Sequence, residues 1–249
     1  MSVQRIRHPQ KLGDHLGAPD EHEVSFVALF DGWIEDLERL HASLATHLGS
    51  RDWELVAVDN PVDAEASERI AALPRIVHAP LRDQMGWSAG RNLGVRLATG
   101  TIVAVVDSSV ELTGDVVACL QDHLRNPEVG LVGRWGVSTS DGYAFAESSG
   151  PDVDGVEAYL MAFRRGDVPR VGLFDPKFKW YRNADIDHSF RVRDAGLRTV
   201  VDPDLPVRRH EHRLWEATPE AERDERSRKN FFRFRDHWGE RKDLFVELN

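Results

Sequence analysis

The stretch GWSAGRNLGVRLATGTIVAVVDSS, residues 86–109, joins a helical pattern directly to a buried-strand pattern. Residues 88–98 read as a helix closed by Gly100. The next six residues, 101–106, are almost all apolar and mostly β-branched. A short apolar run of this kind is typical of a strand that is buried on both faces of a parallel sheet.

Strand and helix patterns alternate in the same way on the N-terminal side of this stretch. The apolar runs predict strands, and apolar residues at helical spacing predict the helices between them. The alternation continues to residue 126 and predicts an α/β fold with a mainly parallel, Rossmann-like sheet and flanking helices. The strands are expected at 24–30, 53–58 and 75–78, and the helices at 33–48 and 64–73.

Three of the predicted strands are followed directly by an aspartate: Asp31, Asp59 and Asp107. In open α/β sheets, ligands bind beyond the carboxyl ends of the strands. Three carboxylates at three strand ends therefore indicate a polar site along one edge of the sheet. The alternative is that aspartate simply favours the turns that follow strands.

The second half of the chain is less regular. Its patterns predict short strands, one loop or hairpin rich in Ser, Gly and Asp, one helix, and one or two amphipathic helices near the C-terminus. These are strands at 129–132, 156–163 and 199–201, a loop or hairpin at 138–155, a helix at 185–195 and amphipathic helices at 219–237. Residues 1–22 are polar without a period and are expected to form a flexible arm.

Composition excludes several classes of function. The chain of 249 residues has a formal net charge of −10, which argues against general nucleic-acid binding. Its single cysteine excludes an internal disulfide and a cysteine-rich zinc site. No run approaches the ~20 apolar residues of a membrane span, and no apolar signal segment is present at the N-terminus. We therefore expect a cytoplasmic protein without a transmembrane segment.

Five segments, in order, resemble the motifs of the family 2 glycosyltransferases, which have the GT-A fold. They run from a first strand and turn to a helix that supplies the catalytic base in this family. The segments are VSFVALFDG at 24–32, VDN at 58–60, GWSAGRNLG at 86–94, VVDSS at 105–109 and ADIDHSFR at 184–191. The resemblance covers about 24–212 and implies that the chain moves a sugar from a nucleotide-diphosphate sugar to an acceptor hydroxyl with inversion.

The resemblance also suggests a division of the chain. A GT-A domain would cover 23–212, with a nucleotide-binding half at 23–126 and an acceptor and catalytic half at 127–212. A C-terminal helical extension would follow at 213–249, and its amphipathic helices could pack on this domain or on a second copy in a homo-oligomer.

Two residues depart from the family pattern. Ser109 stands where the second carboxylate of the Asp-x-Asp motif is expected, and Ala184 stands where a Glu commonly precedes the base. The Gln-x-x-Arg-Trp motif of processive, polymer-making relatives is missing, which favours an enzyme that adds a single sugar. The missing acid keeps open a non-catalytic or nucleotide-binding module. A nucleotidyltransferase is a further alternative, although Phe30-Asp31-Gly32-Trp33 is not the glycine-rich, basic loop of that class.

The resemblance places an inverting base at Asp185, with Asp187 as the competing residue. An inverting transfer needs a group that accepts the proton of the acceptor hydroxyl. Asp187 lies four residues before Arg191, so an ion pair along the helix is its alternative role. The residues expected to bind the nucleotide-sugar are Phe30, Asp31, Asp59, Asn60, Gly86, Arg91, Asn92, Asp107, Ser108 and Ser109.

A divalent cation, Mn²⁺ or Mg²⁺, is expected beside the leaving diphosphate, with Asp107 as one ligand. In an extended segment His210 and His212 point the same way, so both imidazoles can face one site, and imidazole suits manganese better than magnesium. Glu111 is a further possible carboxylate ligand. Nearby cationic side chains form a possible diphosphate clamp, namely Arg208, Arg209 and Arg213.

The sequence leaves the substrates open. The donor is a UDP-, GDP- or dTDP-linked sugar, and the acceptor is a small molecule, a glycan, a lipid-linked sugar or a peptide. Acceptor selection is expected within 135–180. Four aromatic side chains are candidates for stacking on a sugar ring: Trp87, Trp135, Trp180 and Tyr181.

Overall fold

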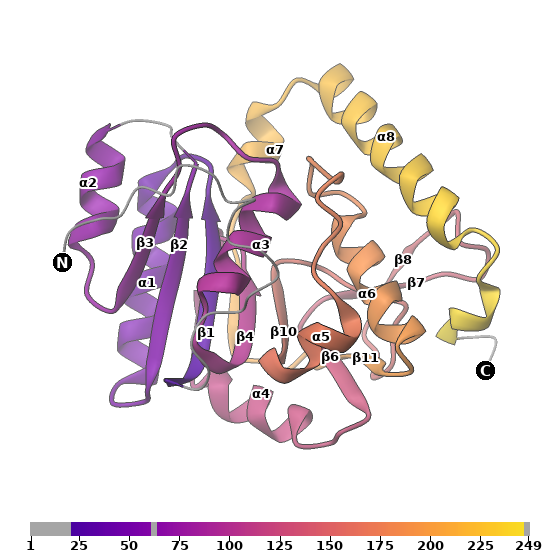
Figure 1. The fold of residues 1–249 in the computed structure, drawn as a ribbon, viewed down its shortest axis with the longest axis horizontal. Coiled ribbons are helices and arrows are strands. Elements are labelled where there is room, and N and C mark those ends of the chain that lie inside the picture. Colours follow the sequence, from indigo (N-terminus) through magenta and orange to yellow (C-terminus); the bar gives the residue numbers. More distant parts are fainter. Residues whose placement is uncertain (1–20, 61–63, 247–249) are drawn as a thin grey trace.

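The computed structural model describes residues 21–60 and 64–246 and shows a central sheet with helices packed against it (Figure 1). Its seven strands lie in the order β11, β6, β10, β4, β1, β2 and β3. Only β10 runs antiparallel to its neighbours, so the predicted α/β fold with a mainly parallel sheet is confirmed. The strands are β1 (His22–Phe30), β2 (Trp53–Asp59), β3 (Ile76–Pro80), β4 (Gly100–Val106), β6 (Val129–Gly133), β10 (Leu160–Arg164) and β11 (Arg198–Val201).

Side chains alternate between the two faces of the sheet, as the period of a strand requires. In β1, Phe26 and Ala28 pack into one hydrophobic cluster, and Val27 and Leu29 pack into the other. The first cluster contains side chains of α1 (Ile34–Leu48), α2 (Ala64–Ala72) and α4 (Val116–Leu124). The second contains side chains of α3 (Trp87–Leu97), α6 (Ala184–Asp194) and α8 (Glu220–Trp238), together with Val168 of the short α5 (Val168–Val171).

Glycines of helix α3 face the strands beneath it and leave no room for a side chain. A Cβ atom at Gly94 would lie 2.3 Å from Cγ1 of Val27, and one at Gly90 would lie 2.6 Å from Cδ1 of Leu29. Larger residues at these two positions would force the helix away from the sheet. The helix therefore begins at a fixed place beside the carboxyl end of β4.

Two smaller sheets complete the fold. Strands β5 (Val110–Leu112) and β12 (Val207–Arg209) form an antiparallel pair, and β7 (Gly136–Ser138), β8 (Ala146–Ser148) and β9 (Gly155–Val156) form the other sheet. The single strand predicted at 156–163 is wrong. The chain turns at 157–159, because β9 pairs with β7 whereas β10 pairs with β4 in the large sheet.

The C-terminal region consists of α7 (Arg213–Ala217), the long helix α8 and a 3-10 turn, Lys242–Leu244. Phe234 and Trp238 of α8 are buried against Phe190 of α6, with ring centroids 5.0 and 5.9 Å apart. Figure 1 shows α8 crossing the same side of the molecule as α6. The predicted arm lies outside the described residues except for its last two, of which His22 begins β1. Within the described ranges, every helix is too short or too polar to cross a bilayer.

Candidate active site

Two adjoining cavities open beside the carboxyl end of β4. The large cavity has a volume of about 840 Å³, and the small cavity has a volume of about 30 Å³. Both are lined by the same five side chains, which therefore form the boundary between them: Trp87, Arg91, Asp107, Tyr181 and His212.

Asp107 is the centre of this boundary. Its Oδ2 atom lies 3.5 Å from Nε2 of His212 and 3.5 Å from Nη2 of Arg91. Arg91 is buried, donates to the carbonyl oxygen of Val106 at 3.1 Å and lies over the ring of Trp87 at 4.5 Å. The sheet edge, α3 and the segment after β12 thus bring one carboxylate, one guanidinium and one imidazole together.

The neighbouring charges shift the pKa values of Asp107 and His212. Burial alone would raise the pKa of Asp107, but its hydrogen bond with His212 and the positive charges of His212 and Arg91 bring this pKa well below its usual range. Burial likewise opposes protonation of His212, yet the hydrogen bond and charge of Asp107 raise the pKa of this imidazole. Asp107 is therefore an anion at neutral pH.

Ser109 explains how the motif is organised without its second carboxylate. Its hydroxyl donates to Oδ1 of Asp107 at 2.6 Å, and its backbone N–H donates to the same oxygen at 2.9 Å. Ser109 is buried and fixes one oxygen of Asp107, so the other oxygen faces His212 and Arg91. A serine at this position orients the remaining carboxylate instead of adding a second one.

Five of the ten residues predicted to bind the nucleotide-sugar line the small cavity. Asp31 is one of them, and burial raises its pKa although Asn60 donates a hydrogen bond to it. The carboxylate edge predicted from three strand ends is thus formed by Asp31 and Asp107. The five lining residues are Asp31, Arg91, Asp107, Ser108 and Ser109.

The other five do not line either cavity and have structural contacts. Oδ2 of Asp59 lies 3.0 Å from Nε2 of His78 on the neighbouring strand β3. Asn60 holds the backbone of Met85 through two hydrogen bonds, and Asn92 holds the backbone of Phe174 in the same way. Phe30 is a core residue in β1, and a side chain at Gly86 would collide with the backbone of Lys179.

Asp185 lies in the first turn of α6 and lines the large cavity. Its Oδ2 atom accepts a hydrogen bond from the backbone N–H of Ala158 at 3.1 Å, and Oδ1 accepts one from Ile186 at 3.0 Å. Burial raises the pKa of Asp185, and these hydrogen bonds oppose the rise. The carboxylate is held in place and has access to the same cavity as Asp107.

Asp187, the competing candidate base, points to the other side of α6. It is fully buried and does not line either cavity. Its Oδ1 atom accepts from Nε1 of Trp238 at 2.8 Å and contacts Nδ1 of His237 at 3.1 Å, and Oδ2 accepts from Nε of Arg191 at 2.8 Å. The ion pair with Arg191 is the alternative role considered for it, and no acceptor in the cavity can reach this carboxylate.

The two histidines of the predicted metal site do not face one point. Nε2 of His210 lies 2.6 Å from Oε2 of Glu111, which also accepts from Arg208. Strand β12 ends at Arg209, so the alternation of an extended strand does not continue to His212. His210 and Glu111 thus have each other as partners in this structure, and of the two histidines His212 is the one that contacts Asp107.

The predicted arginine clamp is also dispersed. Arg208 pairs with Glu111, and Arg209 lies over the ring of Tyr159 at 5.0 Å with Nη1 3.5 Å from Oε2 of Glu157. Only Arg213 lines the small cavity, where its Nε atom lies 3.4 Å from Oδ2 of the buried Asp36.

Two of the four aromatic candidates, Trp87 and Tyr181, line both cavities, whereas Trp135 and Trp180 line neither. The further walls of the large cavity come from the segment 137–147 and the turn at 157–159, which lie within the range 135–180 expected to select the acceptor, and from α7 and α8. Sequence reasoning did not single out the individual side chains, and it did not assign α7 or α8 to the site. The main missed side chains are Tyr143, Phe145, Glu147, Glu157, Tyr159, Arg182, Trp215, Arg228 and Phe231.

Asp107 and His212 are suitable ligands for a divalent cation such as Mn²⁺. They offer one oxygen and one nitrogen 3.5 Å apart at the boundary of the cavities, a donor pair that suits manganese. In this structure Nδ1 of His212 accepts from the Trp215 N–H at 3.2 Å. A cation at Nε2 requires the imidazole proton on Nδ1, so this hydrogen bond would be lost, and the Trp215 N–H would keep only the His212 carbonyl oxygen, 2.9 Å away, as its acceptor. Among the described residues no group of three or more His, Cys, Asp or Glu could hold a metal, so a substrate would have to supply the other ligands.

The fold and the strand-end site define the chain as a GT-A protein, and solved structures support this class. The chain has a TM-score of 0.69 and 16% identity to GalNAc-T7 with UDP, GalNAc and Mn²⁺, covering 90% of this chain and 50% of that one. For the mannosyltransferase PcManGT from Pyrobaculum calidifontis with GDP-Man and Mn²⁺, the TM-score is 0.59 and the identity 20%, covering 79% of this chain and 61% of that one. For the catalytic domain of Drosophila beta1,4galactosyltransferase 7, the TM-score is 0.52 and the sequence identity is 13%. The match covers 80% of this chain and 75% of that one.

The model of glycosyl transferase family 2 matches residues 28–189, and the chain belongs to this family. The matched range includes Asp107 and Asp185 but ends before His212 and α8. A comparison with curated protein sequences finds no match. The chain spans about half of GalNAc-T7 and 61% of PcManGT, so these structures establish its fold.

Proposed function

We propose that this protein transfers a single sugar from a nucleotide-diphosphate sugar to an acceptor hydroxyl, with inversion at the transferred carbon. The observation that carries the proposal is the position of Asp185 and the Asp107–His212 pair on one cavity in a family 2 chain. A carboxylate that accepts a proton and a site for a leaving diphosphate are the two elements that this reaction needs.

The donor and the acceptor share the large cavity, because the small cavity of about 30 Å³ cannot enclose a nucleotide. Asp31, Ser108 and Arg213 of the small cavity contact one part of the donor, and the diphosphate lies at Asp107 and His212. A divalent cation bound there would neutralise the charge that develops on the diphosphate as the glycosidic bond breaks. The acceptor takes the part of the large cavity beside Asp185.

Asp185 acts as the general base. Its carboxylate accepts the proton of the acceptor hydroxyl as the oxygen attacks the sugar from the face opposite the diphosphate. The N–H groups of Ala158 and Ile186 hold both carboxylate oxygens, so the base is oriented before the acceptor arrives. Burial raises its pKa and makes it a stronger base than an exposed aspartate.

A panel of UDP-, GDP- and dTDP-linked sugars tests the proposal directly. Purified protein with Mn²⁺ is expected to release nucleoside diphosphate from at least one donor, faster with an acceptor present. The same nucleotide is expected to raise the melting temperature, because a ligand that binds only the folded state stabilises it. Nucleotide binding without turnover would indicate a binding module. If no nucleotide-sugar turned over and no nucleotide raised the melting temperature, the proposal would fail.

His212→Ala and His210→Ala form a matched pair for the cation site. We expect His212→Ala to raise the Mn²⁺ concentration needed for half-maximal activity by about tenfold or more, because it removes a ligand of the site. His210→Ala is expected to stay within about twofold, since His210 faces Glu111. Titration of activity with Mn²⁺ measures both values. An equal effect of the two substitutions would contradict the assignment of His212.

The pH profile of kcat/KM is expected to show the charge of Glu157. Burial raises the pKa of Glu157 to about 7, and the neighbouring charge of Asp185 contributes to the rise. Glu157 therefore takes its proton near pH 7, before Asp185 does, because the charge of Asp185 raises the pKa of Glu157 whereas burial raises that of Asp185. The rate should fall as pH decreases through the raised pKa of Asp185 in the wild type and in Glu157→Gln alike, whereas a change near pH 7 should be absent from Glu157→Gln. Glu216→Gln, at an exposed lining residue, is the control and should keep the change near pH 7.

A further inference from the structure

We propose that the outer part of the large cavity binds the second sugar ring of an uncharged oligosaccharide acceptor, with Tyr143 and Phe231 as the stacking surface. The proposal rests on the transferase function proposed above and narrows the acceptor class. The outer part is formed by the segment 137–147 and by one side of α8, and its lining residues are Val137, Tyr143, Phe145, Glu147, Ser227, Arg228 and Phe231.

Tyr143 is held in place although it is exposed. The segment that carries it is ordered by Asp141, whose Oδ1 atom accepts from the N–H groups of Tyr143 at 2.7 Å and Ala144 at 2.9 Å. Thr139 anchors the start of this turn: its N–H donates to the buried Asp154 at 2.7 Å, and its hydroxyl accepts from Gly142 at 2.9 Å. The backbone under the tyrosine ring is therefore fixed before any ligand binds.

The ring of Tyr143 has one supported face. The guanidinium carbon of Arg235 lies 3.4 Å from its centroid, and the ring of Phe231 lies 6.3 Å away. The residue is nevertheless 60% exposed, so part of the ring remains free. An exposed aromatic ring that is already held on one face loses little conformational entropy when a ligand binds. Its free face can pack against the apolar C–H face of a sugar.

The positions of the aromatic side chains indicate an acceptor longer than one ring. The volume of about 840 Å³ does not decide this by itself, because the same cavity must also take most of the nucleotide-sugar. Asp185 and Asp107 lie in the inner part, where the reacting hydroxyl must be placed. Tyr143 and Phe231 line the same space from other elements, so a ring that stacks on them is a further ring of the acceptor.

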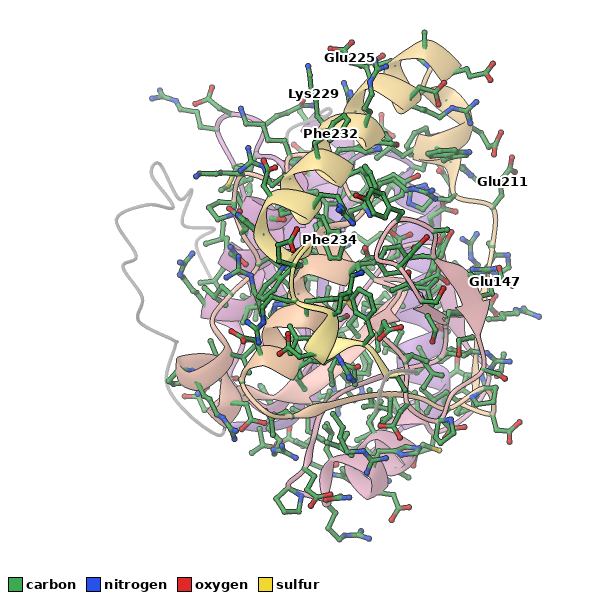
Figure 2. All side chains as sticks on the ribbon, turned by 90° about the vertical axis from the view of Figure 1, so that its right-hand side faces the viewer. Glu147, Glu211, Glu225, Lys229, Phe232 and Phe234 are labelled. Carbon is green, nitrogen blue, oxygen red and sulfur yellow. The ribbon has the colours of Figure 1, made fainter. Side chains whose placement is uncertain are left out.

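The charge of the walls argues for an uncharged acceptor. Four glutamates line the large cavity, whereas the guanidinium groups that the described part of the chain adds to its wall are Arg182, Arg228 and Arg91, the last of which is engaged with Asp107. Figure 2 shows two of the glutamates, Glu147 and Glu211, at the same side of the molecule beside α8. A phosphate-bearing acceptor would meet an excess of like charge here, whereas sugar hydroxyls can donate to carboxylates. The four are Glu147, Glu157, Glu211 and Glu216.

Binding of free sugars tests the subsite without depending on transfer. The probes are glucose, mannose, galactose and N-acetylglucosamine, their disaccharides and glucose 1-phosphate, and saturation-transfer NMR with competition gives each Kd in the presence of nucleoside diphosphate and Mn²⁺. At least one disaccharide is expected to bind more tightly than its monosaccharide. Tyr143→Ala should weaken this disaccharide by about two- to tenfold and leave the monosaccharide unchanged.

Two further variants test whether the aromatic ring at Tyr143 itself is responsible for the preference. Tyr143→Phe keeps the stacking face and should retain the preference for the disaccharide. Phe232→Ala removes another strongly exposed aromatic ring, which lies on α8, packs edge-on against Phe231 with ring centroids 5.9 Å apart and does not line the cavity (Figure 2). This variant should keep the preference for the disaccharide.

Three results would overturn the subsite: no disaccharide binds better than its monosaccharide, Tyr143→Ala weakens both alike, or glucose 1-phosphate binds better than glucose. Donor hydrolysis without acceptor, measured in parallel, reports on the proposed transferase function by itself. Retained hydrolysis together with any of the three results would reject the subsite alone.

Discussion

Asp185→Asn is expected to lower kcat by about 10²- to 10⁴-fold, the range that a general base contributes. The amide has nearly the same shape, but its single oxygen can accept only one of the hydrogen bonds from Ala158 and Ile186, and it cannot take a proton from the acceptor hydroxyl. Nucleotide binding at Asp107 and His212 should be retained, because Asp185 does not line the small cavity. Transfer rates and the nucleotide-induced shift in melting temperature measure the two properties separately.

Asp194→Asn is the matched control for this experiment. Asp194 is the last residue of the same helix, and its partner is Arg241 at 2.7 Å on the surface. This substitution should leave kcat within about twofold, because surface changes away from the cavity have little effect. If Asp185→Asn transferred sugar at the wild-type rate, Asp185 would not be the base.

Asp187→Ala is expected to destabilise the fold by about 3 to 5 kcal/mol, the cost of breaking a buried ion pair. The substitution removes the acceptor for the buried indole N–H of Trp238 and leaves Arg191 without its carboxylate. Unpaired buried groups account for most of the expected loss. The free energy of unfolding from urea titration measures it.

Asp194→Asn serves again as the comparison, because its ion pair is exposed and surface pairs contribute about 0 to 1 kcal/mol. The helix and the loss of one negative charge are then the same, whereas the burial, the partners and the replacing side chain differ. A loss below about 1 kcal/mol for Asp187→Ala would show that the contact between α6 and α8 contributes little to stability.

Most of the fold could be predicted because the patterns of apolar residues that specify its strands and helices are visible within short stretches of the sequence. The apolar runs that become β1, β2 and β4 are short, and each is followed by a helical pattern, which specifies a parallel sheet covered on both faces. The turn at 157–159 could not be predicted, since it interrupts an apolar run and depends on which partner strand each side finds.

The site was predictable where it depends on strand ends and less so elsewhere. Asp31 and Asp107 follow parallel strands and lie at one edge, as expected. Asp59 also follows a strand, but its carboxylate contacts His78 on the neighbouring strand β3, and that neighbour is known only from the sheet order. His210 was misplaced because the extended conformation on which its direction depended ends at Arg209.

The two ends of the large cavity belong to different parts of the chain. Asp107 and Asp185 lie within the range 28–189 that the family shares, whereas Trp215, Arg228 and Phe231 lie beyond it. Mutations in α8 can therefore remodel one wall without altering the reacting groups. Under the proposed function, relatives can acquire new acceptors by divergence of this C-terminal segment while the inherited chemistry stays constant. The hydrogen bond from Trp238 to Asp187 limits this divergence, because α8 must stay packed against α6, the helix that carries Asp185.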